Sequence, residues 1–215
     1  MRWLLIWVLS TLPAWGGGAA WGGGEKTGVF DYYVLSLSWS PNWCALRGDA
    51  QGSDQCAARH DHGWILHGLW PQYHRGHPSY CQTVERPPSR AMTQDMADIM
   101  GTPGLAWHQW EKHGTCSGLS ADDYFALSRH AYNEIMRPPV FRKLERAVKL
   151  PASVVEEAFL KANPDWQPDM VTITCKDGHI QEARLCLSRD LGPVPCGQDV
   201  VRDCRMRDAV FAPVR

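Results

Sequence analysis

The sequence has no long apolar segment, no strong excess of charge of one sign and no closely spaced pair of cysteines. Its 22 basic residues are nearly balanced by 23 acidic residues, so the chain is not a general nucleic-acid coat. Its eight cysteines include no C-x-x-C pair, and because structural zinc sites normally use such pairs, disulfides are favoured over metal. Apolar residues make up 44% and charged residues 21%, which predicts a packed globular protein rather than a disordered chain.

Three kinds of catalytic site are disfavoured because their motifs are missing. There is no Gly-x-Ser-x-Gly nucleophile elbow, and no glycine-rich phosphate loop follows a predicted strand. A zincin site needs two histidines four residues apart with a glutamate after the first. Here His108 and His113 are five apart, about 140° around a helix, and Gln109 follows His108. We therefore expect no metal and no cofactor.

The apolar segment that is present is short and lies at the N-terminus. Arg2 precedes the apolar run from Trp3 to Leu9, and small residues follow it around Gly18 to Ala20. These features predict a secretory signal peptide over residues 1 to 20, since a membrane anchor would need about 20 apolar residues. We expect residues 25 to 215 to form a single domain that is periplasmic or secreted, with no membrane attachment after cleavage. The lack of an Asn-x-Ser/Thr acceptor weakly favours a bacterial origin and hence the periplasm.

Removal of residues 1 to 24 takes away one basic residue, Arg2, and leaves 21 basic against 23 acidic residues. All nine histidines remain, so their full protonation would move the net charge from −2 to +7. The eight cysteines also remain, and an even number in an exported chain predicts four disulfides. Eight cysteines allow 105 pairings, among which the sequence alone does not choose.

Periodicity and turn residues predict an α+β fold, with a central antiparallel β-sheet flanked by several α-helices and stabilised by disulfides. Pro71 is expected to end the second strand because proline cannot donate to the ladder. Ser120 is expected to cap a helix. The predicted strands are residues 29 to 39, 64 to 69, 171 to 175 and 179 to 187. The predicted helices are residues 91 to 100, 105 to 113, 120 to 136 and 153 to 162.

The first segment with chemical interest is His67-Gly68-Leu69-Trp70-Pro71. Side chains alternate along a strand, so His67 and Trp70 need a bend to share a pocket, and Gly68 or Pro71 could supply it. Taken alone, this histidine fits a hydrogen-bonded position in a core strand equally well.

The second segment is Trp107-His108-Gln109-Trp110-Glu111-Lys112-His113-Gly114-Thr115-Cys116. In a helix, His108 and Lys112 face the same side, and Gly114 would end the helix next to His113. The helix C-terminus favours a protonated His113 whereas Lys112 opposes it, so the pKa of His113 could move in either direction.

Several histidines and a lysine beside tryptophans, with neither metal nor protein nucleophile, suit the cleavage of RNA. The 2′-hydroxyl of RNA is itself the nucleophile, so a protein needs only a base, an acid and stabilisation of the phosphorane charge. Two other hypotheses stay open: an RNA-binding or cytotoxic module that has lost turnover through Gln109, and a disulfide-stabilised binding domain with buried histidines. The clustering of His108, Lys112 and His113 beside tryptophans argues against the latter.

The two segments resemble the signature motifs of the ribonuclease T2 family. Together with Ser38-Trp39-Ser40-Pro41 and the cysteine layout, the resemblance covers roughly residues 29 to 204. It implies a ribonuclease T2-like fold and a metal-independent RNA endonuclease of broad base tolerance. The reaction would form a 2′,3′-cyclic phosphate and then hydrolyse it to a 3′-phosphate. RNA is then the expected partner, and we expect a monomer with no obligate protein partner.

The resemblance also assigns roles to single residues. It implies His113 as the general base, His67 as the general acid, and His108 and Lys112 as the groups that hold the phosphate. The candidate substrate-binding residues are Trp70, which would stack on a base, Gln72 and Trp39. The implied disulfides are Cys44–Cys56, Cys81–Cys116, Cys175–Cys204 and Cys186–Cys196.

One supporting residue departs from the family pattern. The family usually has glutamate where this chain has Gln109. An amide can hydrogen-bond a phosphate oxygen but cannot accept a proton or hold a cation by charge. We expect reduced turnover or a shifted pH optimum rather than inactivity, because His67, His113 and Lys112 remain.

Overall fold

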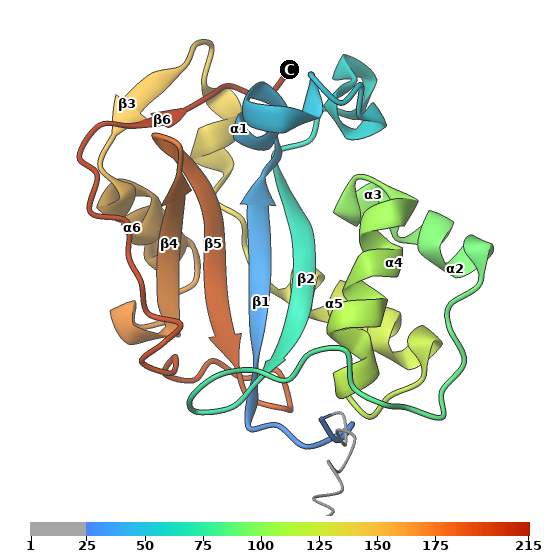
Figure 1. The fold of residues 1–215 in the computed structure, drawn as a ribbon. Coiled ribbons are helices and arrows are strands. Elements are labelled where there is room, and N and C mark those ends of the chain that lie inside the picture. The colour runs from blue at the N-terminus through green and yellow to red at the C-terminus, as the bar shows by residue number, and fades with distance from the viewer. Residues whose placement is uncertain (1–24) are drawn as a thin grey trace, which may run out of the picture.

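The computed structural model describes residues 25–215, so the predicted signal peptide lies outside the described residues. Its centre is a six-stranded sheet in the order β2-β1-β5-β6-β3, with β4 paired to β5 (Figure 1). The pairs are antiparallel, except that β5 and β6 meet in parallel at a single residue pair. The strands are β1 (Tyr32–Trp39), β2 (Trp64–Gln72), β3 (Val148–Leu150), β4 (Val171–Lys176), β5 (His179–Leu187) and β6 (Ala209–Phe211).

Helices pack next to the sheet both at β2 and at β4, which confirms the predicted α+β class. In Figure 1, α3 and α4 lie beside β2 and α2 packs on their outer side, whereas α6 lies by β4. Thr102 and Ser120 cap α4 and α5 by accepting hydrogen bonds from the backbone N–H three residues on, at 3.1 and 3.2 Å. The helices are α1 (Ser40–Trp43), α2 (Arg90–Asp95), α3 (Ala97–Met100), α4 (Pro103–Lys112), α5 (Ala121–Glu134) and α6 (Ala152–Ala162).

Some element boundaries differ from those predicted. Strand β2 does not end at Pro71 but continues to Gln72. It is an edge strand, so the missing N–H of proline can face away from the sheet without loss of a ladder bond. The helix predicted over residues 91 to 100 is two short helices that meet at Met96. Helix α1 and the short strands β3 and β6 were not predicted.

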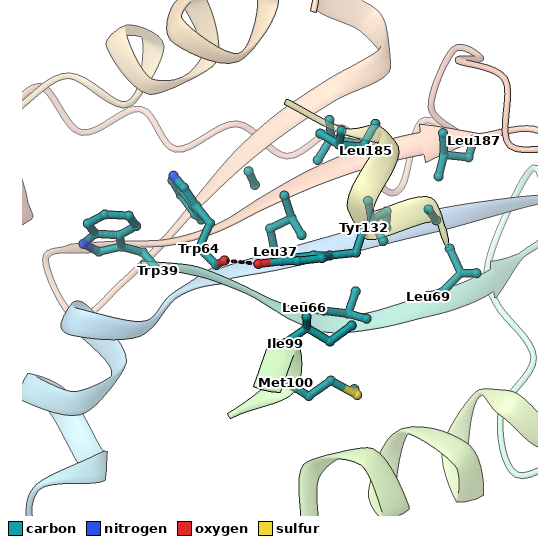
Figure 2. Close-up of a cluster of buried hydrophobic side chains, with 14 of the residues drawn as sticks. Leu37, Trp39, Trp64, Leu66, Leu69, Ile99, Met100, Tyr132, Leu185 and Leu187 are labelled. Carbon is teal, nitrogen blue, oxygen red and sulfur yellow. Dashed lines mark hydrogen bonds between the residues drawn. The ribbon is translucent and has the colours of Figure 1, made fainter. Parts of the chain in front are cut away.

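The core lies between the sheet and the helices and is rich in aromatic rings. Tyr132 from α5 donates a hydrogen bond of 2.8 Å to the carbonyl oxygen of Trp64 (Figure 2). Trp39 is 0% exposed and stacks on Phe211 with ring centres 4.5 Å apart. Its indole N–H donates to the carbonyl oxygen of Ala212. The prediction that Trp39 binds substrate was therefore wrong, because its ring is enclosed by the core and cannot reach a base.

Four disulfides join the pairs that the resemblance implied: Cys44–Cys56, Cys81–Cys116, Cys175–Cys204 and Cys186–Cys196. The first closes the segment between β1 and β2 on itself, as predicted. The second connects the segment after β2 to the residues just beyond α4. Within residues 25–215, no helix has the length and apolar character needed to cross a membrane.

Candidate active site

A β-bulge presents His67. Ser36 of β1 pairs with Gly68 and the next residue, Leu37, pairs with Leu66, so His67 is the extra residue in β2. A bulge bends its strand and redirects a side chain. His67 and Trp70 are accordingly the two partly exposed residues of an otherwise buried strand. The bend that the sequence required is present, but it falls at His67 itself rather than at Gly68 or Pro71.

Gly68 is needed because a hydrogen bond crosses directly above it. The indole N–H of Trp70 donates to Oε1 of Gln109 at 2.7 Å. A Cβ atom on Gly68 would lie 2.1 Å from that oxygen and 2.4 Å from the indole nitrogen. Any larger residue would break the bond, and this bond joins the first sequence segment to the second.

Helix α4 and its C-terminus supply the other predicted side chains. The helix ends at Lys112 and His113 is its C-cap, as the sequence indicated. His108 is exposed, Lys112 is partly buried and His113 is 3% exposed. The backbone N–H of Tyr80 donates to the carbonyl oxygen of Lys112 at 2.9 Å, which ties the helix end to the segment after β2.

Burial, the largest cause, and the positive charges of Lys112, His77, His67 and His108 together lower the pKa of His113 to about 2. Of the two directions that the sequence left open, the structure selects this one. The Nδ1 atom is buried without a hydrogen-bond partner. The imidazole ring stacks on Trp70, with ring centres 5.2 Å apart and planes 24° apart. His113 is therefore a neutral, rigidly held imidazole at ordinary pH.

These side chains share one cleft of about 450 Å³. Its lining contains seven of the eight predicted site residues, namely His67, Trp70, Gln72, His108, Gln109, Lys112 and His113. Trp39 is the exception. Gln72 is 5% exposed and its amide donates to the carbonyl oxygen of Pro71 at 3.0 Å. The edge of the His67 ring meets Trp70 at 5.2 Å between centres, so Trp70 contacts both histidines.

The cleft residues that the sequence did not predict include His77, Glu182 and Arg184. Glu182 is 1% exposed, and its Oε1 lies 2.5 Å from Nδ1 of His67. Arg184 donates to its other oxygen from Nε at 2.9 Å and from Nη2 at 2.7 Å. A signal was available, because two opposite charges two residues apart share one face of a predicted strand. Nothing in the sequence links that face to His67.

Glu182 carries a negative charge despite its burial. Burial by itself raises its pKa, but hydrogen bonding to His67 and the charges of His67 and Arg184 outweigh burial and lower the pKa to about 2. Since an ionised carboxylate only accepts hydrogen bonds, the bond to His67 requires a proton on Nδ1. The other ring nitrogen, Nε2, is then the one available to the cleft.

The hollow continues past His67. A second cavity of about 330 Å³ shares His67 and Gln181 with the cleft and extends to Ser38, Ile65 and Thr102. His67 thus stands between two connected depressions. Among residues 25–215, no three His, Cys, Asp or Glu side chains gather closely enough to hold a metal ion.

Comparison with known proteins identifies the family to which this fold belongs. A model of the Ribonuclease T2 family matches residues 30–196. The chain belongs to the ribonuclease T2 family. The matched span includes both sequence segments and all the cleft residues up to Arg184.

Relatives of this ribonuclease T2 chain occur in bacteria and plants. It is 43% identical over 128 residues to a protein described as "Ribonuclease" from Aeromonas hydrophila, a match that covers 60% of this chain and 56% of the relative. It is 35% identical over 121 residues to a "Probable ribonuclease" from Haemophilus influenzae, covering 50% of this chain and 44% of the relative. The matches thus span about half the length of these two bacterial proteins.

Solved structures share the fold. The "RNase-related protein from Calystegia sepium" superposes with a TM-score of 0.63 at 18% identity, covering 88% of this chain and 98% of the other. A structure titled "Crystal structure of RNase NT in complex with 5'-AMP" gives a TM-score of 0.61 at 17% identity, covering 87% and 100%. At these identities, the likeness concerns the fold alone.

Proposed function

We propose that this chain is an RNA endonuclease that cleaves by transphosphorylation, with His113 as general base and His67 as general acid. The observation that carries the proposal is the unlike state of two histidines in one cleft. One is buried and neutral, and the other is hydrogen-bonded to an ionised carboxylate. Groups whose surroundings differ in this way suit opposite proton-transfer roles.

The first step needs a base without a proton. His113 would take the proton of the 2′-hydroxyl on Nε2, because Nδ1 is buried, while the 2′-oxygen forms its bond to phosphorus. The low pKa of His113 keeps it unprotonated well below pH 6.5, so the acid limb of the pH profile should lie in the acid range. A bound phosphate would oppose the nearby cations and strengthen the base in the complex.

The leaving oxygen needs a proton. His67 would donate it from Nε2 as the bond from phosphorus to the 5′-oxygen breaks and its electron pair passes to that oxygen. The products are a 2′,3′-cyclic phosphate and a free 5′-hydroxyl. Reversal of the two roles, with water in place of the 5′-hydroxyl, would hydrolyse the cyclic phosphate to a 3′-phosphate.

The charge that builds on the phosphoryl oxygens needs donors. Lys112 and His108 lie four residues apart on α4, and both line the cleft. Gln109 adds a neutral donor. Because an indole N–H can only donate, Oε1 of Gln109 must be the atom that faces Trp70, and its NH₂ group remains for the phosphate.

Recognition of RNA would rest on shape and stacking. Trp70 and Gln72 remain the candidates for contact with a base, and stacking on an aromatic ring would be compatible with broad base tolerance. An exported monomer, periplasmic or secreted, remains the expected form.

The test is digestion of RNA by the purified protein with EDTA present, followed by mass spectrometry of the end groups. We expect 2′,3′-cyclic phosphate ends and no cleavage of DNA, which lacks the nucleophile. His67→Ala and His113→Ala should each lower kcat by about 10²- to 10⁴-fold, the usual worth of a proton-transfer group. His130→Ala, at an exposed histidine on α5, is the matched control. Full cleavage by either site variant would disprove the residue assignment.

One observation favours a second candidate, RNA binding without turnover: Gln109 is an amide where the family usually has a carboxylate. In that case RNA would be retained without cyclic-phosphate product. Gln109→Glu would then restore cleavage, whereas in an active enzyme it would only modify the existing rate.

A further inference from the structure

Glu182 is a buried carboxylate that belongs to neither sequence motif. Transfer of a charge from water into a protein interior costs several kcal/mol unless hydrogen bonds and opposite charges compensate for it. Here the compensation is complete on both oxygens, since Oε1 meets His67 and Oε2 accepts two bonds from Arg184. A carboxylate retained under these conditions needs an explanation that packing does not supply.

The backbone is irregular at the two places that form this pair. His67 is the extra residue of a bulge in β2. Strand β5 contains a second bulge, opposite β4. Thr174 of β4 pairs with Glu182, and the next residue of β4, Cys175, pairs with Ile180, so Gln181 is the extra residue. Bulges redirect side chains and occur often next to active sites.

Strand β1 separates the two bulged strands. Its Ser36 pairs with Gly68 on one side and its Ser38 pairs with Glu182 on the other. Strands two positions apart lie about 10 Å from each other, a span that only two long side chains can bridge. His67 and Glu182 meet across β1, because the bulge in β2 turns His67 to the face on which Glu182 lies through its regular pairing with Ser38.

We propose that Glu182 is a positioning residue for the general acid, His67. This inference rests on the proposed function. The carboxylate keeps the proton of His67 on Nδ1, turns Nε2 toward the leaving 5′-oxygen and stabilises the imidazolium form before the proton is given up. Arg184 holds the carboxylate in place from the opposite side.

Arg184 extends the arrangement to the rest of the cleft. Its guanidinium lies 5.4 Å from the centre of the Trp70 ring, and Trp70 stacks on His113. The acid and the base are therefore connected through Glu182, Arg184 and Trp70. None of these three transfers a proton in the proposed reaction.

The first experiment varies the leaving group in Glu182→Gln. Cleavage of a dinucleotide releases an alkoxide that needs a proton, whereas a nucleoside 3′-(4-nitrophenyl phosphate) releases nitrophenolate, which leaves without one. We expect kcat for the dinucleotide to fall roughly 10- to 100-fold and kcat for the aryl ester to fall by less than about threefold. KM should stay the same for both. Equal losses on the two substrates would indicate general damage and overturn the proposal.

Glu156→Gln is the matched control. Glu156 is a partly buried glutamate on α6 that does not line the cleft, so the same chemical change there should leave both rates as they were.

The second experiment needs neither activity nor a variant. In ¹⁵N-labelled protein above the titration of His67, long-range ¹H–¹⁵N correlations should show its proton on Nδ1. A proton on Nε2 would overturn the proposal. If the chain cleaves neither substrate, the proposed function fails and the spectrum alone decides whether Glu182 sets the tautomer. When Glu182→Gln does not fold, the spectrum of the unmodified protein still tests the proposal.

Discussion

The amide of Gln109 can accept one hydrogen bond through its oxygen and donate others through its NH₂ group, whereas an ionised carboxylate only accepts. Its oxygen accepts the indole N–H of Trp70, and its NH₂ group remains for the cleft that His108, Lys112 and His113 also line. A glutamate could accept the same indole bond. It would then leave a negative oxygen, rather than a donor, beside the phosphate. Gln109 thus exchanges a group that can hold a proton for one that can only bind.

Gln109→Glu should move the acid limb of the kcat/KM profile toward higher pH by about one unit, because a nearby negative charge favours the protonated form of His113. The measurement is the pH dependence of dinucleotide cleavage. Gln82→Glu introduces the same charge at an exposed position outside the cleft and should leave the limb in place. A shift of the same size in both variants would show that net charge, and not position 109, controls the profile.

Among the elements, the C-terminal end of α4 carries the tightest constraint. His113 caps the helix, and the Cys81–Cys116 disulfide and the Tyr80–Lys112 backbone bond fasten this end to the segment after β2. The disulfide thereby connects the proposed acid on β2 and the proposed base after α4 covalently.

Replacement of both Cys81 and Cys116 by serine should destabilise the protein by about 4 kcal/mol, because the bond closes a 35-residue separation. The double-serine variant of Cys44 and Cys56, which closes 12 residues, should cost about 3 kcal/mol. Urea unfolding measures both losses. Well below the melting temperature, kcat should fall markedly only in the first variant. If the two variants lose activity in proportion to stability alone, the disulfide does not position the site.

At the scale of the whole molecule, the active site couples function to acid stability. His113 binds a proton in the unfolded chain below about pH 6.5 but in the folded chain only near pH 2. Glu182 behaves likewise between its ordinary pKa of 4.5 and about 2. In both windows the unfolded state holds more protons, so stability falls as the pH falls. The two groups on which the proposed reaction depends in acid therefore weaken the fold there.

His113→Gln should flatten the loss of stability between pH 6.5 and 4.5, where His113 contributes roughly 1 kcal/mol per pH unit, and should reduce the loss between pH 4.5 and 2 while leaving the part that Glu182 contributes. Urea titrations followed by the fluorescence of the 11 tryptophans provide the measurement. His130→Gln, on the exposed face of α5, serves as the comparison. An unchanged slope in His113→Gln would mean that His113 is not held neutral by the fold.

The lowered pKa of two histidines reduces the positive charge expected in acid. Counting nine histidines gives a large positive swing on protonation. Burial lowers the pKa of both His113 and His62, so the two contribute less positive charge near pH 6 than a count of histidines assumes. The gain in attraction for a polyanion such as RNA is smaller than the histidine count suggests.

Local patterns in the sequence were enough to predict the class of fold, most of the helices and strands, and the two segments that carry His67, His108, Lys112 and His113. These features depend on local information: side-chain periodicity, caps such as Ser120, and the spacing of histidines within one helix or strand. The four disulfide pairs followed from the family resemblance and not from spacing.

Only the tertiary structure decided the features that join distant segments. The contact between His67 and Glu182 spans 115 residues of sequence and depends on the bulge at His67, which no local pattern reveals. The burial of Trp39 and the pairing of β3 with β6 depend likewise on how distant segments pack. The pKa of His113 was undetermined in the sequence because burial, its largest cause, exists only once the chain has folded.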